Sequence, residues 1–191
     1  MKTWNYVPVS GNYAQASVGM AAISIAKQLG LIVVATTRNK NKTDALHKNG
    51  ADYVVIDNGQ IASQVKQLFS SDNGVNCVLE LIGTVTLLDS IQAAAPKGIV
   101  CNTGILGNEW IIKNFEPLLA IPSTVKLTVY KSEIITAANS TKALEQIVDG
   151  VAKGRYHVNL DKVLHFDEIV DAHHYMEENR SKGKLVVVVD Q

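Results

Sequence analysis

Short apolar runs rich in valine and isoleucine alternate along most of the chain with segments whose apolar residues recur at helical spacing. Such runs are typical of strands buried on both faces, and the other segments of the helices that cover them. Their alternation predicts an α/β protein with a doubly wound parallel sheet and helices on both faces. We predict strands at Asn5–Ser10, Ile32–Thr37, Tyr53–Ile56, Asn76–Leu81, Gly98–Asn102 and Lys126–Tyr130. We predict helices at Ser17–Leu29, Lys42–Lys48, Ile61–Phe69 and Val85–Ala95.

The pattern changes in the last third of the chain. Ser140 is a residue type favoured at helix N-caps, and apolar residues at helical spacing after it predict a helix through Lys153. We then predict a short apolar run at Lys162–Phe166, a helix near Asp167–Asn179 and a closing strand at Lys184–Val189. Because the closing strand lies outside the six-strand pattern, we expect it to have paired with another domain. We therefore divide the chain into a sheet domain at 1–138 and a C-terminal segment at 139–191.

Composition and charge narrow the class of protein. The 191 residues suit one domain with a small appendage, and Lys plus Arg and Asp plus Glu both total 18. This balance gives no bulk field for nucleic acid or an anionic membrane. No apolar run reaches the length of a membrane span, and the N-terminus lacks the apolar core of a signal peptide. With reduced thiols favoured over a disulfide at Cys77 and Cys101, we expect a cytoplasmic protein.

The turn after the first predicted strand is built mainly of small residues. Such residues let backbone N–H groups approach a pyrophosphate, and a helix N-terminus favours its negative charge. The usual G-x-G-x-x-G spacing is absent: counted back from Gly19, its middle glycine position falls on Ala16, and Gly11 lies too early to be its first glycine. The segment is therefore either a phosphate-binding turn or an ordinary strand-to-helix connection of an α/β domain.

The end of the second predicted strand carries hydroxyl and cationic groups. It reads Thr36-Thr37-Arg38-Asn39-Lys40-Asn41-Lys42, with no carboxylate before Asp44. Sites for NAD place an acidic residue on the ribose at this point, whereas sites for NADP place cations there. Guanidinium, ammonium and hydroxyl groups suit a 2′-phosphate, so the sequence favours NADP(H). The alternative is that Arg38, Lys40 and Lys42 are solvated loop charges.

Several other classes of site fit the sequence poorly. None of the tyrosines has a lysine four residues later, which disfavours a short-chain dehydrogenase. The second strand does not end in the acidic residue that a methyltransferase would use. His173 and His174 are adjacent and point about 100° apart on a helix, so they converge poorly on a metal, and we expect no metal site. The acidic residues of the last third are interpreted as solvated faces and caps, so we expect no catalytic carboxylate pair.

Motifs spread over nearly the whole chain resemble the medium-chain dehydrogenase/reductase superfamily, also called zinc-type alcohol dehydrogenase-like proteins. The resemblance is greatest to the zinc-free, quinone oxidoreductase-like branch. It rests on Ser17-Val18-Gly19-Met20-Ala21-Ala22-Ile23, Ala35-Thr36-Thr37-Arg38-Asn39, Gly50-Ala51-Asp52-Tyr53-Val54, Thr103-Gly104-Ile105-Leu106-Gly107-Asn108-Glu109-Trp110, Phe115-Glu116-Pro117, Ile121-Pro122-Ser123 and Gly183-Lys184-Leu185-Val186.

The resemblance implies a Rossmann-type domain that binds NADP(H). It implies contacts from Ser17 and Val18 to the pyrophosphate, from Thr37, Arg38 and Lys42 to the 2′-phosphate, from Ile82 and Gly83 to the ribose, and from Thr103, Gly104, Ile105 and Leu106 to the nicotinamide. It also implies that an N-terminal catalytic domain, absent from this chain, forms the other wall of the active site. Finally, it implies a homodimer formed through the edge strand at 126–130.

Three interpretations of function remain open at this point. In the first, the chain is the cofactor-binding domain of an oxidoreductase that transfers hydride to a quinone, enone or carbonyl substrate. This domain contributes no catalytic residue of its own and turns over poorly alone. In the second, it is a non-catalytic dinucleotide-binding or dimerisation module left by truncation. In the third, the irregular turn has closed and no dinucleotide binds.

Overall fold

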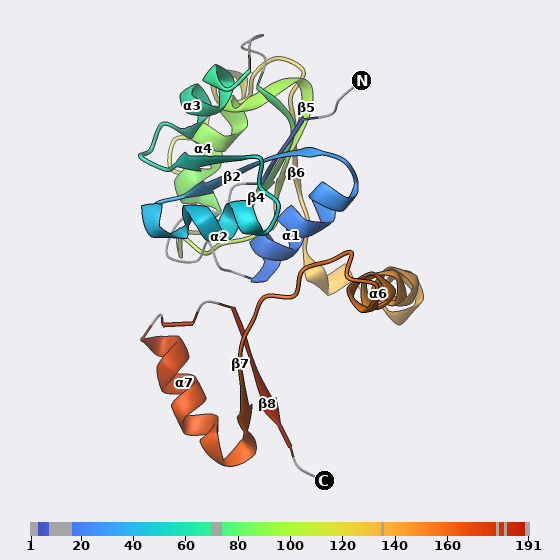
Figure 1. The fold of residues 1–191 in the computed structure, drawn as a ribbon. Helices are drawn as coiled ribbons and strands as arrows, with labels where there is room; N and C mark the ends of the chain where they lie inside the picture. Colours follow the sequence, from blue (N-terminus) through green and yellow to red (C-terminus); the bar gives the residue numbers. More distant parts are fainter. Residues whose placement is uncertain are drawn as a thin grey trace.

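The computed structural model describes residues 4–7, 17–69, 74–134, 136–178, 180–181 and 183–189. A six-stranded sheet with its helices forms the larger part of the molecule. Helix α6 projects from one side of it, and a smaller unit of β7, β8 and α7 lies below (Figure 1). The small-residue turn at 11–16 lies outside the described residues. None of the described helices is both long enough and apolar enough to cross a membrane.

All strands of the main sheet run parallel, in the spatial order β3-β2-β1-β4-β5-β6. The chain builds the sheet outward from β1 to β3, returns to the centre, and builds outward again from β4 to β6. This order is the doubly wound arrangement predicted from the sequence, and it places a topological switch point between β1 and β4. The strands are β1 (Trp4–Val7), β2 (Ile32–Thr37), β3 (Tyr53–Ile56), β4 (Val75–Glu80), β5 (Ala94–Asn102) and β6 (Lys126–Val129).

Helices cover both faces of this sheet, and each face has its own apolar core. Strand β2 contributes to both cores. Val34 packs in the core that includes α3 and α4, whereas Val33 and Ala35 pack in the core that includes α1 and α2. A strand alternates its side chains between faces, so its continuous apolar run serves both cores. The helices and helical turns are α1 (Ser17–Gln28), η1 (Lys40–Lys42), α2 (Thr43–Lys48), α3 (Ile61–Gln67), α4 (Thr84–Gln92) and α5 (Pro117–Ala120).

The C-terminal segment contains α6 (Ala137–Ala152), β7 (Leu160–His165), η3 (Phe166–Glu168), α7 (Ile169–Glu177) and β8 (Lys184–Val188). The predicted N-cap at Ser140 is wrong, because this residue lies inside α6 and its hydroxyl donates to the carbonyl of Thr136 at 2.6 Å. A serine in a helix interior forms such backward hydrogen bonds. The closing strand β8 pairs in parallel with β7, with Val186 opposite Val163.

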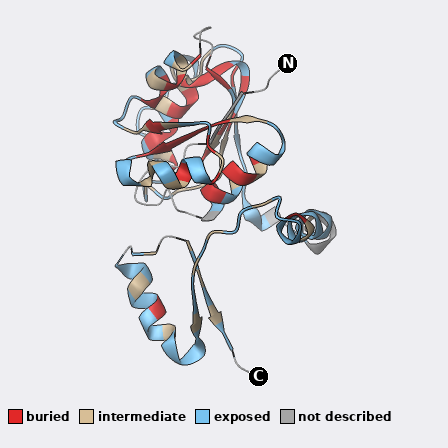
Figure 2. Cartoon of the chain, in the orientation of Figure 1, coloured by how far each residue is buried: buried red, intermediate tan, exposed pale blue. Residues whose placement is uncertain are grey.

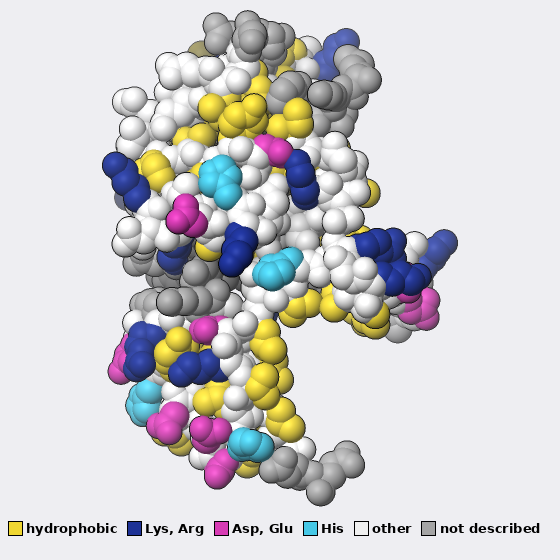
Figure 3. All heavy atoms as spheres, in the orientation of Figure 1, with side chains coloured by type: hydrophobic (Ala, Val, Ile, Leu, Met, Phe, Trp, Pro, Cys, Tyr) yellow, Lys and Arg dark blue, Asp and Glu magenta, His cyan; other side chains and the backbone are white. Residues whose placement is uncertain are grey.

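Burial differs sharply between the two parts. Most buried residues lie in the six-stranded unit, whereas β7, β8, α6 and α7 are largely exposed (Figure 2). Along β8, exposed and half-buried side chains alternate, so the described residues do not cover both faces of the strand. Figure 3 shows apolar side chains along the β8 side of the small unit and beneath α6, facing a hollow between them. The expectation that another domain covers β8 remains a prediction.

Candidate functional site

A cleft of about 910 Å³ opens where β4 and β5 end. Because β4 lies at the switch point of the sheet, this is the edge at which doubly wound proteins bind ligands. The walls come from the first turn of α1, the loop between β4 and α4, the end of β5 with the loop after it, and the segment after β6. The lining residues are Val18, Leu81, Gly83, Thr84, Asn102, Thr103, Gly104, Ile105, Leu106, Trp110, Val129, Tyr130, Lys131, Ser132 and Glu133.

Two of these walls are joined by backbone hydrogen bonds. The N–H of Thr103 donates to the carbonyl of Glu80 at 2.9 Å, and the N–H of Gly107 donates to the carbonyl of Ile82 at 2.8 Å. Gly83 has a φ of 93°, and a Cβ at this position would lie 2.9 Å from the carbonyl oxygen of Gly104. The two loops therefore approach each other so closely that only glycine fits at Gly83.

Behind this wall, the carboxylate of Glu80 is fully buried. Its Oε1 accepts the N–H of Ile82 at 2.7 Å, the N–H of Gly83 at 3.2 Å and the hydroxyl of Thr86 at 3.0 Å, and its Oε2 accepts the hydroxyl of Ser90. Burial raises the pKa of Glu80 above its ordinary value, while these hydrogen bonds oppose the rise. Glu80 was not among the site residues predicted from the sequence. Its signal was a carboxylate ending an apolar strand, followed by hydroxyls on the buried face of the next helix.

Six of the predicted site residues line this single cleft. They are Val18, Gly83, Thr103, Gly104, Ile105 and Leu106. Val18 is 56% exposed at the start of α1, and the hydroxyl of Thr103 donates to the carbonyl of Tyr130 at 3.0 Å. Ile82 is buried directly behind the lining. Ser17 begins α1, and its side chain lies outside the described part of the chain. Residues far apart in the sequence thus meet at one edge of the sheet.

The remaining predicted residues lie at the end of β2, apart from this cleft lining. Thr37 is fully buried, and its hydroxyl accepts the N–H of Asn39 at 3.1 Å. Its hydroxyl therefore serves the turn after β2, and Thr37 is not among the proposed phosphate contacts. Arg38 Nε donates to Asp57 Oδ2 at 3.3 Å, while about half of the Arg38 side chain stays exposed. Lys42 is half-buried, and burial lowers its pKa. Asp57, which follows β3, is a second carboxylate that the sequence analysis missed.

Among the described residues, two polar atoms at the carboxyl ends of strands have no hydrogen-bond partner. They are Oγ1 of Thr36 on β2 and Oδ1 of Asn102 on β5, both buried. Buried polar groups in proteins normally have a protein or water partner. Asn102 lies in the cleft lining, so an unpaired acceptor accompanies the nicotinamide end of the predicted site. A polar ligand in this cleft suits that arrangement.

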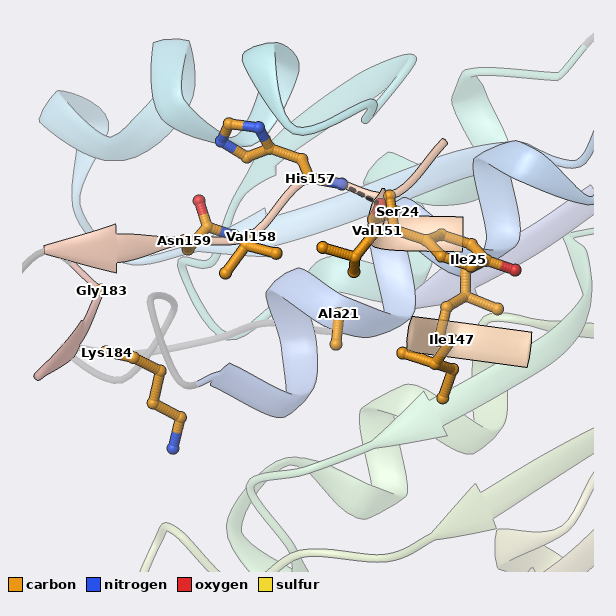
Figure 4. Close-up of a pocket in the computed structure, with 11 residues that line it drawn as sticks. Ala21, Ser24, Ile25, Ile147, Val151, His157, Val158, Asn159, Gly183 and Lys184 are labelled. Carbon is orange, nitrogen blue, oxygen red and sulfur yellow. Dashed lines mark hydrogen bonds between the residues drawn. The ribbon is translucent and has the colours of Figure 1, made fainter. Parts of the chain in front are cut away.

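A smaller, apolar cavity of about 210 Å³ lies between α1, α6 and the segment before β7. In Figure 4, Ala21 and Ile25 of α1 lie near Ile147 and Val151 of α6, while the Lys184 ammonium lies apart from them. The hydroxyl of Ser24 accepts the N–H of His157 at 3.2 Å. This cavity marks where α6 and the following segment pack on α1, and most of its lining is apolar.

Comparison with known proteins places the chain in a family. The family model for zinc-binding dehydrogenases matches residues 49–187, which is most of the chain, so this protein belongs to that family. The 2-haloacrylate reductase of Burkholderia sp. is 22% identical over 204 aligned residues, covering 98% of this chain and 56% of the reductase. Other curated relatives are matched over half of their length or less.

Solved structures agree with the fold. A mycobacterial quinone oxidoreductase superposes with a TM-score of 0.84 at 21% identity, covering 98% of this chain and 57% of that protein. The Escherichia coli quinone oxidoreductase, solved as a complex with NADPH, superposes with a TM-score of 0.77 at 18% identity, covering 98% and 58%.

Because the family is described as zinc-binding, the described side chains can be compared with the ligands of a zinc site. Within the described ranges, no group of three or more His, Cys, Asp or Glu side chains is arranged to hold a metal ion. Structural zinc sites need four such ligands, and catalytic sites need three. Cys77 and Cys101 are free thiols on the neighbouring strands β4 and β5. The residues described here do not fit a zinc site, and we derive no step through zinc.

Proposed function

We propose that this chain is the NADP(H)-binding part of an oxidoreductase that transfers hydride to a quinone, enone or carbonyl substrate. The observation that carries the proposal is the cleft at the ends of β4 and β5, in which six residues predicted for the cofactor come together. Family membership supports it, as does the likeness of the fold to a reductase solved with NADPH. The orphaned Asn102 Oδ1 in the lining fits a polar ligand.

In this proposal, each wall of the cleft contacts a different part of the cofactor. Ser17 and Val18, at the N-terminus of α1, hold the pyrophosphate, where the helix dipole and backbone N–H groups favour an anion. Ile82 and Gly83 border the ribose. The segment Thr103–Leu106 lies along the nicotinamide and fixes which face is presented. The bound cofactor supplies the hydride, and the protein supplies binding and orientation.

At the adenosine end, Arg38 and Lys42 bind the 2′-phosphate. The Asp57 carboxylate holds Arg38 through Nε. Within the part of the chain that the structure describes, the terminal guanidinium nitrogens have no hydrogen-bond partner, which leaves them for a phosphate oxygen. Charge-assisted pairs of this kind are strong and geometrically selective. This arrangement distinguishes NADPH from NADH by one anionic group.

Part of the cleft lining is apolar, and we assign the substrate to that part. Trp110 is 75% exposed, and Val129 and Leu106 belong to the same lining. An apolar wall next to the nicotinamide suits the unsaturated carbon skeleton of a quinone or enone. No described residue is assigned as a proton donor, so the proton comes from water or from a second domain. The competing interpretation is a dinucleotide-binding module without turnover.

A direct titration tests the proposal. Dihydronicotinamide fluorescence should report NADPH binding in the micromolar range, with adenosine 2′,5′-bisphosphate as a competitor. Reduction of a soluble quinone by the same preparation would show an enzyme, and binding without reduction would favour the module. Absence of any binding by either ligand would remove the proposed function.

Two partners belong to the same proposal. Strand β6 ends the main sheet, and Val129 at its end is 60% exposed, so we propose that a second copy pairs there. The apolar hollow between α6 and β8 supports cover by a further domain, since the chain spans about half the length of the reductases it matches. Sedimentation velocity tests the dimer: a monomer at tens of micromolar would contradict it.

A further inference from the structure

We infer that Glu80 is a positioning residue, whose buried carboxylate sets the wall of the cleft beside the nicotinamide by holding the backbone of Ile82 and Gly83. The inference rests on the proposed function for its ligand, and on the geometry around Glu80 for its mechanism. No Glu80 atom reaches the cleft surface, because the residue is fully buried. Its effect on a ligand must therefore pass through the backbone that it holds.

Four hydrogen bonds are donated to the carboxylate of Glu80. Two backbone N–H groups, of Ile82 and Gly83, and two hydroxyls, of Thr86 and Ser90, converge on one carboxylate. The N–H groups belong to the loop that lines the cleft, and the hydroxyls to the buried face of α4. Glu80 therefore joins the cleft loop to the helix behind it. Helix α4 has no side-chain cap at Gly83, so this carboxylate is the anionic group at its N-terminus.

The loop at 81–83 is in turn hydrogen-bonded to the segment after β5. The carbonyls of Leu81 and Ile82 accept the N–H groups of Leu106 and Gly107, at 3.3 and 2.8 Å. A displacement of the loop at 81–83 therefore moves the segment at 103–107, which is the other wall of the cleft. A Cβ added at Gly83 would lie 2.9 Å from the carbonyl oxygen of Gly104, so the two loops lie close together at this point.

The position of Glu80 differs from that of a buried carboxylate that only stabilises the fold. Helix α4 carries a carboxylate of its own, Asp89, which accepts the N–H of Ile61 at 2.6 Å and the N–H of Ala62 at 3.3 Å. Asp89 thus holds the first backbone N–H groups of α3, as Glu80 holds those of the cleft loop. It does not belong to the cleft lining. It provides a matched control, because its loss weakens the fold without touching the wall beside the nicotinamide.

The experiment compares Glu80→Gln with Asp89→Asn. Glutamine keeps the shape of Glu80 and removes one acceptor oxygen and the charge. We expect Glu80→Gln to weaken NADPH binding about tenfold and to reduce dihydronicotinamide fluorescence enhancement, while affinity for adenosine 2′,5′-bisphosphate stays unchanged. We expect Asp89→Asn to bind both ligands as the unaltered chain does. Equal losses of both ligands in Glu80→Gln, or no loss of either, would overturn the inference.

Amide hydrogen exchange keeps the inference testable without a cofactor. In Glu80→Gln, the amides of Ile82, Gly83, Leu106 and Gly107 should exchange about tenfold faster or more, and in Asp89→Asn only those of Ile61 and Ala62 should do so. Unchanged exchange at the cleft amides would refute the positioning role. If the unaltered chain binds no nicotinamide cofactor, the proposed function fails, and the exchange pattern still decides the role of Glu80.

Discussion

Arg38 Nε lies 3.3 Å from Asp57 Oδ2, which ties the turn after β2 to the residue that follows β3. The carboxylate is almost fully buried, with 4% of its side chain exposed, whereas half of the Arg38 side chain is open. Asp57 therefore orients the guanidinium from behind. This pair is the structural basis for the proposed preference for a cofactor with a 2′-phosphate.

Replacing Arg38 and Lys42 together with alanine should weaken NADPH binding about 10- to 100-fold, because charge-assisted hydrogen bonds to the 2′-phosphate are lost. NADH, which lacks that phosphate, should bind with nearly unchanged affinity. Fluorescence titrations with both cofactors measure the difference. Lys40→Ala is the control, since Lys40 is exposed in the same loop and is not among the proposed contacts. Equal losses for NADPH and NADH would contradict the specificity.

Gly83→Ala should lower the free energy of unfolding by roughly 1–3 kcal/mol and also weaken NADPH binding. The alanine Cβ would meet the carbonyl oxygen of Gly104 at 2.9 Å, in addition to the strain of a φ of 93°. Urea denaturation gives the first quantity. Gly59→Ala isolates the conformational part, because Gly59 has a φ of 84° but no atom within 4 Å of an added Cβ. Similar costs at both positions would mean that the loops yield to the extra methyl.

Asp89→Ala should destabilise the fold by about 1–2 kcal/mol, since it removes the acceptor for the first N–H groups of α3. No side chain at the N-terminus of α3 itself supplies a cap hydrogen bond. Urea denaturation followed by circular dichroism measures the loss. Ser63→Ala serves as a comparison on the same helix, because its hydroxyl is exposed and donates to the carbonyl of Gln60. An equal loss in both variants would count against capping by Asp89.

The pH dependence of stability should carry a contribution from Glu80. Burial raises the pKa of Glu80 in the folded state above its ordinary value of 4.5, so the folded protein holds this proton more tightly than the unfolded chain does. The resulting stabilisation is fully present below pH 4.5 and is lost as pH rises through the raised pKa. The free energy of unfolding of the unaltered chain, minus that of Glu80→Gln, should therefore fall as pH rises from 4.5. A difference that is flat across this range would contradict the raised pKa.

The sequence predicted the strands of the main sheet well, and β2 and β3 were predicted to the residue. The apolar run of β2 is clear in the sequence because nearly all of its residues are buried, whereas β3, at the edge of the sheet, is only partly buried. The motif residue Asp52 also has a visible reason: its carboxylate accepts the N–H of Val33 at 2.8 Å and pairs with Lys27. Asp52, which directly precedes β3, thereby connects α1 and β2.

The hydrogen-bond partners of individual polar side chains were harder to predict from the sequence. Thr37 looked like a phosphate ligand, yet its hydroxyl is buried in the turn after β2. Ser140 looked like a cap, yet α6 begins before it at Ala137. A polar side chain near the end of an element has several partners within reach, and residue type alone does not select among them.

By itself, the sequence determined the order of strands and helices, the small residues of the predicted cofactor edge and the family, because these depend on local pattern and on the apolar content of each segment. Only the tertiary structure decided the partners of Glu80, Asp57 and Asp89. Each of these carboxylates finds donors supplied by chain geometry or by another element, and burial makes every such group require a partner. The choice of partner follows from how the elements pack, and no single segment of the sequence contains it.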